Sequence, residues 1–200
     1  MNSALELDLT PPADEDDHSQ GPSIAPVTVV EYADFECLHC ARAHPFLKQL
    51  RDEIPGAFRL VFRHFPLLAD HPRAASAARA AVAAGRQGRF WEMHDRLFEY
   101  QAYLRPDAFL LHAEDLGLDL ERFNRDLADP QVTARVERDM ASGRASGVRG
   151  TPTFFLNGVR YGDGWDLNLL RRAILIAAVS TSRVVSRGSP VMVGGPQRLA

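Results

Sequence analysis

The chain contains only two cysteines, Cys37 and Cys40, and both lie where an apolar segment gives way to a helical pattern. Residues 27–35 are β-branched, aromatic and apolar enough to predict a central strand that is buried on both faces. After Cys37, apolar residues recur at helical spacing to about residue 53. This junction constrains the fold strongly, because the end of a strand, the start of a helix and two thiols must all meet at one point.

The segments that follow the junction extend this pattern. Residues 58–65 alternate again and predict a second strand, so the first half of the chain reads as a βαβ unit. Between residues 72 and 146 strand signals vanish and several apolar stripes at helical spacing follow one another. These stripes are interpreted as the packed core of an all-helical region.

The last part of the chain returns to strands. Residues 153–156 predict a strand, Asn157-Gly158 is a two-residue sequence that favours a type I′ turn, and residues 159–161 predict the returning strand. Asp166 can cap a closing helix that reaches about residue 178. The second half is therefore a ββα unit.

These elements predict an α/β fold in which an all-helical insertion separates the βαβ half from the ββα half. The predicted divisions are a flexible acidic lead-in over residues 1–25, one α/β domain made of residues 26–69 and 148–179, a helical insertion over residues 70–147, and a disordered tail over residues 180–200.

Composition narrows the class of protein. With 46% hydrophobic and 24% charged residues the chain has an ordinary globular composition, and its net charge of -3 without a basic run argues against nucleic-acid binding. The most apolar late segment, residues 167–179, is too short to span a bilayer and contains Arg171 and Arg172. Residues 1–17 lack the basic start and apolar core of a secretory signal, which predicts a cytoplasmic location.

The spacing of the cysteines indicates redox chemistry. A Cys-x-x-Cys pair on the first turn of a helix places the first thiol where backbone N–H groups lack partners, so Cys37 is predicted to be the nucleophilic thiolate and Cys40 the resolving thiol. His39, between them, could add to thiolate stabilisation or simply face solvent. Glu31, inside the predicted buried strand, could accept the Cys40 proton through water or form a salt bridge.

Zinc is the main alternative for the cysteine pair. Two thiolates supply half of a tetrahedral site, but the chain has no second Cys-x-x-Cys. No tight paired spacing is found among the remaining candidate ligands, which are His64, His71, His94 and His112. The sequence thus favours a redox pair that needs no organic cofactor or metal, and leaves open a non-catalytic protein-binding module with inert or zinc-bound cysteines.

Two motifs together resemble a known family. The strand ending in Asp34-Phe35-Glu36, followed by Cys37-Leu38-His39-Cys40, and the distant Gly150-Thr151-Pro152-Thr153-Phe154-Phe155 before Asn157-Gly158 resemble the DsbA-like thiol-disulfide oxidoreductases of the thioredoxin fold. The resemblance covers about residues 21–179. It implies a thioredoxin fold, and a helical insertion of this size is typical of the group.

The resemblance also assigns roles to residues. It implies that Cys37 attacks, Cys40 resolves, His39 is the motif histidine and Glu31 is the buried acid. It further implies that Pro152 is cis and lies across from the cysteines, so that the backbone of Thr151 can pair with an extended substrate peptide as an added strand.

Partners and departures follow from the same resemblance. The expected partners are protein or peptide thiols and disulfides, together with a redox recycling partner that the sequence does not identify. Leu38 stands where members often carry proline, and the dipeptide between the cysteines affects redox poise in this family. The acidic amino-terminal segment also resembles the linkers seen where such modules are fused to sodium/proton antiporters.

Overall fold

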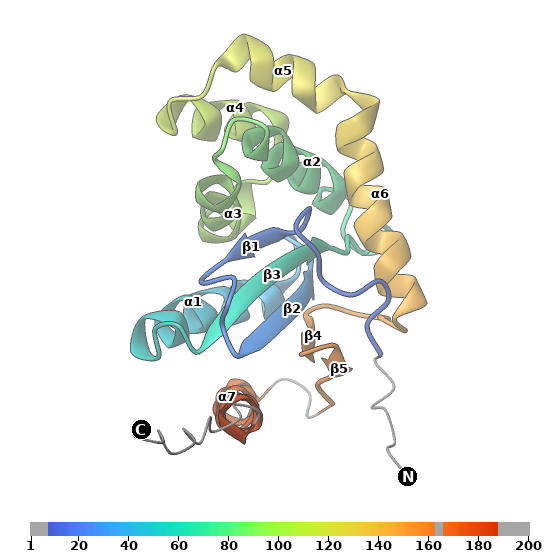
Figure 1. The fold of residues 1–200 in the computed structure, drawn as a ribbon. Coiled ribbons are helices and arrows are strands. Elements are labelled where there is room, and N and C mark those ends of the chain that lie inside the picture. The colour runs from blue at the N-terminus through green and yellow to red at the C-terminus, as the bar shows by residue number, and fades with distance from the viewer. Residues whose placement is uncertain (1–7, 163–165, 188–200) are drawn as a thin grey trace, which may run out of the picture.

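The computed structural model describes residues 8–162 and 166–187 of the chain, with side chains described to residue 180 (Figure 1). The strands are β1 His18–Gln20, β2 Val27–Ala33, β3 Phe58–His64, β4 Thr153–Leu156 and β5 Val159–Arg160. The helices are α1 Leu38–Glu53, α2 Ala74–Gly85, α3 Phe90–Glu99, the 3₁₀ turn η1 Gln101–Tyr103, α4 Pro106–Asp115, α5 Leu120–Ala128, α6 Pro130–Ala145 and α7 Leu167–Arg187.

One five-stranded sheet forms the centre of the fold, in the order β1-β3-β2-β4-β5. Strands β2 and β3 are parallel, and the other neighbours are antiparallel. The prediction of a central strand is confirmed, because β2 lies between β3 and β4 and is almost entirely buried. The α/β thioredoxin fold with a helical insertion is likewise confirmed.

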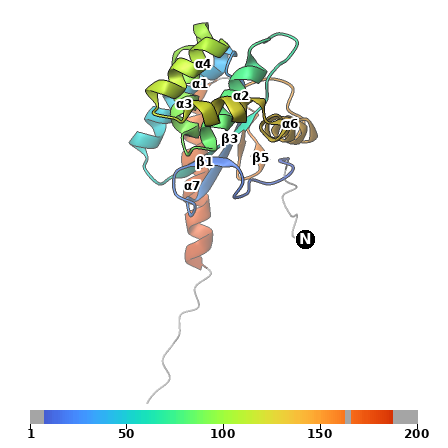
Figure 2. The same cartoon turned by 90° about the horizontal axis from the view of Figure 1, so that it is seen from above.

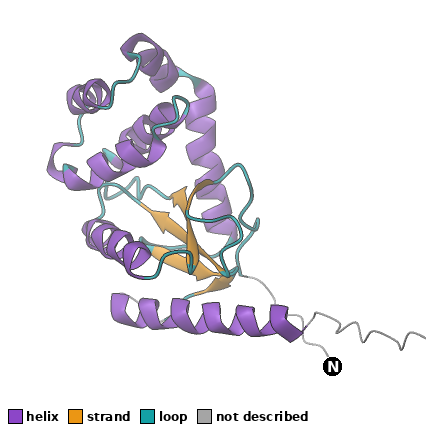
Figure 3. Cartoon of the chain, turned by 60° about the vertical axis from the view of Figure 1, so that its left-hand side comes forward, coloured by secondary structure: helices purple, strands orange, loops and turns teal. Residues whose placement is uncertain are grey.

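The two faces of β2 pack against different helices. Val27 and Val29 contact a core formed with α1 and α7, whereas Val30 and Tyr32 face the layer that includes the end of α6. Figure 2 shows α1 and α6 on opposite sides of the sheet, and Figure 3 shows α7 running along the same side as α1. Glu31 alternates with Val30 and Tyr32, so it faces the α1 side.

Helix α6 approaches the sheet closely because Gly143 has no side chain. A Cβ atom at Gly143 would lie 2.5 Å from Phe65 Cδ2, which is closer than real Cβ atoms approach, and 3.1 Å from Tyr32 Cδ1, which is an unusually tight contact. Next to it, the Tyr32 hydroxyl shares a 2.8 Å hydrogen bond with Ser142 Oγ. This small-residue contact anchors the long helix that returns the chain from the insertion to β4.

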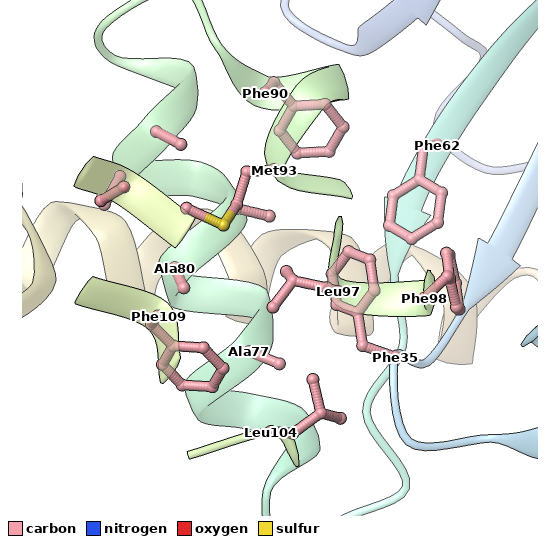
Figure 4. Close-up of a cluster of buried hydrophobic side chains, with 14 of the residues drawn as sticks. Phe35, Phe62, Ala77, Ala80, Phe90, Met93, Leu97, Phe98, Leu104 and Phe109 are labelled. Carbon is pink, nitrogen blue, oxygen red and sulfur yellow. The ribbon is translucent and has the colours of Figure 1, made fainter. Parts of the chain in front are cut away.

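The helical insertion builds its own core against the end of the sheet (Figure 4). Small side chains on α2, among them Ala77 and Ala80, let α3 approach, while Leu97 and Phe98 reach toward Phe35 and Phe62 of the sheet layer. The predicted interpretation of the apolar stripes as core is confirmed. The insertion therefore covers the end of the sheet from which α1 and its cysteines begin.

The acidic lead-in is not loose over its described part, which corrects the predicted division at residue 25. Residues 18–20 form β1, antiparallel to β3, and Leu9 is buried. Arg63 holds Asp17 with two hydrogen bonds of 3.0 and 2.8 Å, with both side chains almost fully buried. The sequence pattern missed this order because it is supplied by an arginine on a distant strand, not by any period within the lead-in.

The end of the chain also differs from the prediction. Helix α7 continues to Arg187, beyond the predicted end at residue 178 and into the predicted disordered tail. The helix breakers Gly188 and Pro190 begin only after that point, so nothing in residues 179–187 ends the helix. The remainder of that predicted tail and residues 1–7 lie outside the described residues. No described helix has both the length and the hydropathy needed to cross a bilayer.

Candidate active site

Cys37 and Cys40 lie on the first turn of α1, at the point where β2 ends. Cys37 is the residue that caps the helix, and its N–H donates to Asp34 O at 3.1 Å. Both thiols are free and buried, Cys40 completely so. The predicted junction between strand and helix therefore places both sulfurs at the positive end of a helix.

The two thiols have very different acidities. A hydrogen bond from the Cys40 thiol is the largest stabilising contribution and, together with the Thr151 side chain and the backbone N–H groups of Cys40 and His39, lowers the pKa of Cys37 to about 5 against the opposing effect of burial. Burial, the hydrogen bond to Cys37 and the charges of Glu31 and Cys37 raise the pKa of Cys40 well above its usual range. At neutral pH Cys37 is therefore the thiolate and Cys40 the proton carrier.

Thr151 and Pro152 complete the site from the other half of the chain. The Thr151–Pro152 peptide bond is cis, and the Cys37 thiol donates a 3.2 Å hydrogen bond to Thr151 O. Thr151 is buried, and its hydroxyl oxygen has no hydrogen-bond partner in the form with a neutral Cys37 thiol. Once Cys37 ionises and stops donating, this hydroxyl is the group that can donate to the thiolate.

Glu31 is a buried acid beneath the cysteines. Burial, followed by the negative charge of the Cys37 thiolate, raises the pKa of Glu31 to about 8. Its side chain borders a small cavity of about 10 Å³, whose other walls include His44 and His94. A carboxyl group that titrates near neutral pH and interacts electrostatically with Cys40 has the properties that a proton acceptor needs.

His39 and Leu38 point outward from the first turn of α1. His39 is exposed, and among the groups that stabilise the Cys37 thiolate it contributes its backbone N–H. Leu38 is 69% exposed, so it presents an apolar surface beside the cysteines. The structure thus brings Cys37, Cys40, Glu31, Thr151 and Pro152 together, with His39 at the rim.

Two further residues shape the site and were given no role from the sequence. Asp34 Oδ1 accepts from Glu36 N at 2.7 Å, and Asp34 Oδ2 accepts from Leu67 N at 2.8 Å and lies 2.7 Å from His71 Nδ1. Asp34 thereby fixes the turn that enters the cysteine motif. In the sequence, the only sign of this role was the place of Asp34 in the Asp34-Phe35-Glu36 triplet that leads into the cysteine motif.

Gln101, from the helical insertion, is the second. Its Nε2 atom donates to Phe35 O at 2.8 Å and to Cys37 O at 3.0 Å, so a turn of the insertion holds the backbone of the active-site loop. No local pattern marks Gln101, because its role depends on how the insertion folds back. The insertion is therefore part of the site as well as its cover.

The arrangement bears on the zinc alternative. Within the described ranges, the only group of three potential metal ligands is His44, His94 and Asp95, and it does not include either cysteine. Cys37 Sγ lies 3.2 Å from Thr151 O, and Glu31 interacts electrostatically with both cysteines. This environment separates the acidities of two thiols, as an oxidoreductase requires.

The fold is of the thioredoxin type and carries a Cys-x-x-Cys pair at the start of α1, and comparisons with known proteins agree. Residues 13–174 match the model of a family described as thioredoxin, so the chain belongs to that family. A thioredoxin-like oxidoreductase from Silicibacter pomeroyi is 32% identical, with a TM-score of 0.72 over 86% of this chain and 94% of that one. Wolbachia pipientis α-DsbA1, at 21% identity, shares the fold with a TM-score of 0.74 over 86% and 96% of the two chains.

Curated relatives carry a different description. A sodium/proton antiporter NhaA 3 from Salinispora tropica is 47% identical over 175 residues, which is 87% of this chain and 27% of the antiporter. An antiporter NhaA from Herminiimonas arsenicoxydans is 46% identical over 163 residues, 81% of this chain and 26% of that protein. The chain thus spans about a quarter of the length of these relatives.

Proposed function

We propose that this chain exchanges disulfides with protein substrates through the Cys37–Cys40 pair. The observation that carries the proposal is the separation of the two acidities, which leaves one buried thiolate beside one buried thiol. The thioredoxin family and the similarity to an oxidoreductase of 32% identity support it. Thiolate attack on a disulfide needs neither an organic cofactor nor a metal.

In the reducing direction, the Cys37 thiolate attacks one sulfur of a substrate disulfide. A sulfur–sulfur bond forms between Cys37 and the substrate, and the other substrate sulfur leaves as a thiolate. In this mixed disulfide the charge of Cys37 no longer raises the pKa of Glu31, which favours the ionised carboxylate. Cys40 then gives its proton to the ionised Glu31, directly or through water, and attacks the sulfur of Cys37. The second substrate thiolate leaves, the substrate has gained two electrons, and Cys37–Cys40 is a disulfide. The reverse sequence oxidises a dithiol substrate.

The backbone of Thr151 is the proposed guide for the substrate. Thr151 lies beside Cys37 and precedes β4, so an extended peptide can lie along this backbone as an added strand. Recognition of main-chain atoms tolerates many sequences, whereas Leu38 offers only an apolar contact next to the sulfur. The substrate class is therefore an accessible disulfide or thiol in an extended segment of protein.

Trapping tests this proposal. The Cys40→Ser variant should accumulate mixed disulfides with client proteins, visible as reducible bands on a non-reducing gel. Cys37→Ser should give no such bands and no turnover of a peptide disulfide, and the double Cys37→Ser, Cys40→Ser variant is the matched control. Turnover that persists in Cys37→Ser would refute the assignment of Cys37 as the nucleophile, whereas no turnover by the unmodified chain would favour the binding module with inert cysteines.

The sequence identity to part of the antiporters supports a second, related proposal, which concerns the partner protein of this chain. We infer that the chain acts in the cytoplasm next to a membrane transport protein of the sodium/proton antiporter class, which is the description of relatives 46–47% identical to it. Mixed disulfides trapped by Cys40→Ser should then be enriched in the membrane fraction. A soluble-only set of trapped clients would contradict this association while leaving disulfide exchange intact.

The proposed location also predicts the resting state of the pair. Cytoplasmic glutathione and thioredoxin systems keep accessible thiols reduced, so Cys37 and Cys40 should rest as dithiols that act as a reductant. Alkylation of intact cells before lysis, followed by a gel-shift count of free thiols, measures this state. A pair found mainly as disulfide would indicate an oxidising compartment or partner.

A further inference from the structure

A second polar cluster lies about one helical turn beyond the cysteines. His44, on α1, and His94 and Asp95, on α3, place one potential ligand atom each within 4.8 Å of one another. His44 Nε2 is 3.7 Å from Asp95 Oδ1, and His94 Nδ1 is 3.0 Å from the same oxygen. The cluster therefore joins the thioredoxin-like core to the helical insertion.

The distances suit a tetrahedral ion of the zinc type. Zinc bonds to imidazole nitrogen and carboxylate oxygen are about 2.0–2.2 Å, so neighbouring ligand atoms on a tetrahedron are about 3.3–3.5 Å apart. The two distances to Asp95 Oδ1 bracket this value. Small rotations of the His44 and His94 rings would bring the remaining pair of nitrogens to the same separation.

The ligand types also suit a zinc-class cation. Imidazole nitrogen and carboxylate oxygen are both common zinc ligands. In the structure His94 Nδ1 and Asp95 Oδ1 share a 3.0 Å hydrogen bond. Metal binding at Nδ1 would move the His94 proton from this hydrogen bond to Nε2, which is buried without a hydrogen-bond partner, and that cost lowers the affinity for a metal.

Space for a fourth ligand lies beside the three side chains. The cavity of about 10 Å³ is bordered by His44, His94, Asp95 and Glu31, and it admits about one water molecule. An ion held by three side chains and one water would resemble the open type of zinc site. The water would face Glu31, the buried acid under the cysteines.

Two cations oppose this use of the cluster. Lys48 Nζ donates to Asp95 Oδ2 at 3.0 Å, and Arg51 borders the same cavity. The Lys48 side chain is 48% exposed, so it can swing into solvent when another cation takes its place. Without metal, Lys48 and Asp95 form an ion pair. Lys48 therefore competes with an added cation for Asp95 and lowers the affinity of the cluster for that cation.

The geometry points to a divalent transition-metal site of the zinc class at His44, His94 and Asp95, bridging α1 to α3 beside the redox pair. Ligation replaces the Lys48–Asp95 ion pair and clamps the insertion to the helix that bears the cysteines. The site is separate from Cys37 and Cys40, and it does not depend on the proposed exchange reaction.

Zinc titration of the full chain tests the site, in the Cys37→Ser, Cys40→Ser background so that thiolates cannot bind the metal. Calorimetry should show one zinc ion per chain, and zinc should raise the melting temperature relative to the same protein in EDTA. Cobalt substitution should give the visible absorption of a tetrahedral site with nitrogen and oxygen ligands. His44→Gln should lower the affinity at least tenfold, whereas His39→Gln, an exposed histidine, should not change it.

Lys48→Ala separates a metal site from a plain ion pair. It removes the competing cation without touching a ligand, so zinc affinity should rise, by threefold or more. This variant alters an exposed side chain and keeps the proposal testable if His44→Gln folds poorly. The proposal fails if millimolar zinc does not bind, if binding survives His44→Gln unchanged, or if Lys48→Ala leaves the affinity the same or lower.

Discussion

The Cys37 thiol donates its hydrogen to the carbonyl oxygen of Thr151 at 3.2 Å, although 114 positions separate the two residues. This contact exists only while Cys37 is protonated, because a thiolate has no hydrogen to donate. When Cys37 ionises, the Thr151 carbonyl oxygen therefore loses this hydrogen bond. The Thr151 hydroxyl can then donate a hydrogen bond to the thiolate. The same residue can thus serve the thiol with its backbone and the thiolate with its side chain.

The acidity of Cys37 is directly measurable. Thiolate absorbance in the reduced protein, followed by pH titration, should give a midpoint near 5, because Cys40, Thr151 and two backbone N–H groups stabilise the anion. At pH 7, two units above that midpoint, this stabilises the reduced form by about 3 kcal/mol relative to an ordinary thiol, or roughly 60 mV of oxidising tendency. Cys37→Ser serves as the control, because it keeps Cys40 and should show no absorbance step near pH 5. A midpoint near 8.5 would contradict the assignment.

Thr151→Val should raise the pKa of Cys37 by removing the hydroxyl while keeping the backbone carbonyl and the side-chain volume. The expected change is about one to two pKa units, the size of one hydrogen bond to a charged group. The rate of alkylation of Cys37 as a function of pH reports the shift. Thr153→Val, which removes a hydroxyl bonded to Gly150 O, is the matched control and should leave the midpoint in place. An equal shift in both variants would exclude a specific role for Thr151.

Glu31→Gln should stabilise the protein, and more so at pH 8 than at pH 5. The folded-state pKa of about 8 lies above the unfolded value of about 4.5, so between these values the folded state binds more protons and loses stability as pH rises. A neutral amide avoids that loss, by on the order of 3–5 kcal/mol at pH 8. Urea unfolding at both pH values measures the difference. A variant whose stability relative to the wild type is independent of pH would show that Glu31 is already ionised at little cost.

Sequence reasoning located the site because its two halves carry strong local signals. The strand before Cys37, the helix after it and the Asn157-Gly158 turn, whose two residues have φ values of 49° and 84°, each follow from residue type alone. The contact between Cys37 and Thr151 does not, since it depends on β4 lying antiparallel to β2. That pairing was available from the resemblance to a family and not from spacing.

Other parts of the site depend on long-range contacts that no pattern encodes. Gln101 reaches the active-site loop only because the insertion folds back over the end of the sheet. His44 and His94 are fifty positions apart and show no paired spacing, yet their ring centroids lie 5.1 Å apart where α1 meets α3. The roles of such residues can be recognised only from the tertiary structure, which shows which side chains they contact.

Asp17→Asn tests whether the lead-in is an integral part of the fold. The carboxylate of Asp17 is buried with Arg63, and removing one member of a buried pair leaves the other uncompensated, which typically costs about 3–5 kcal/mol. The variant should unfold at lower urea concentration and become sensitive to proteolysis within the lead-in. Burial opposes ionisation of Asp17, but the Arg63 hydrogen bonds and charge prevail and lower its pKa, so the stabilisation should also fade as pH falls through that lowered value. Glu15→Gln, two residues away and exposed, should change neither property, and equal behaviour of the two variants would show that the Asp17–Arg63 pair does not hold the lead-in.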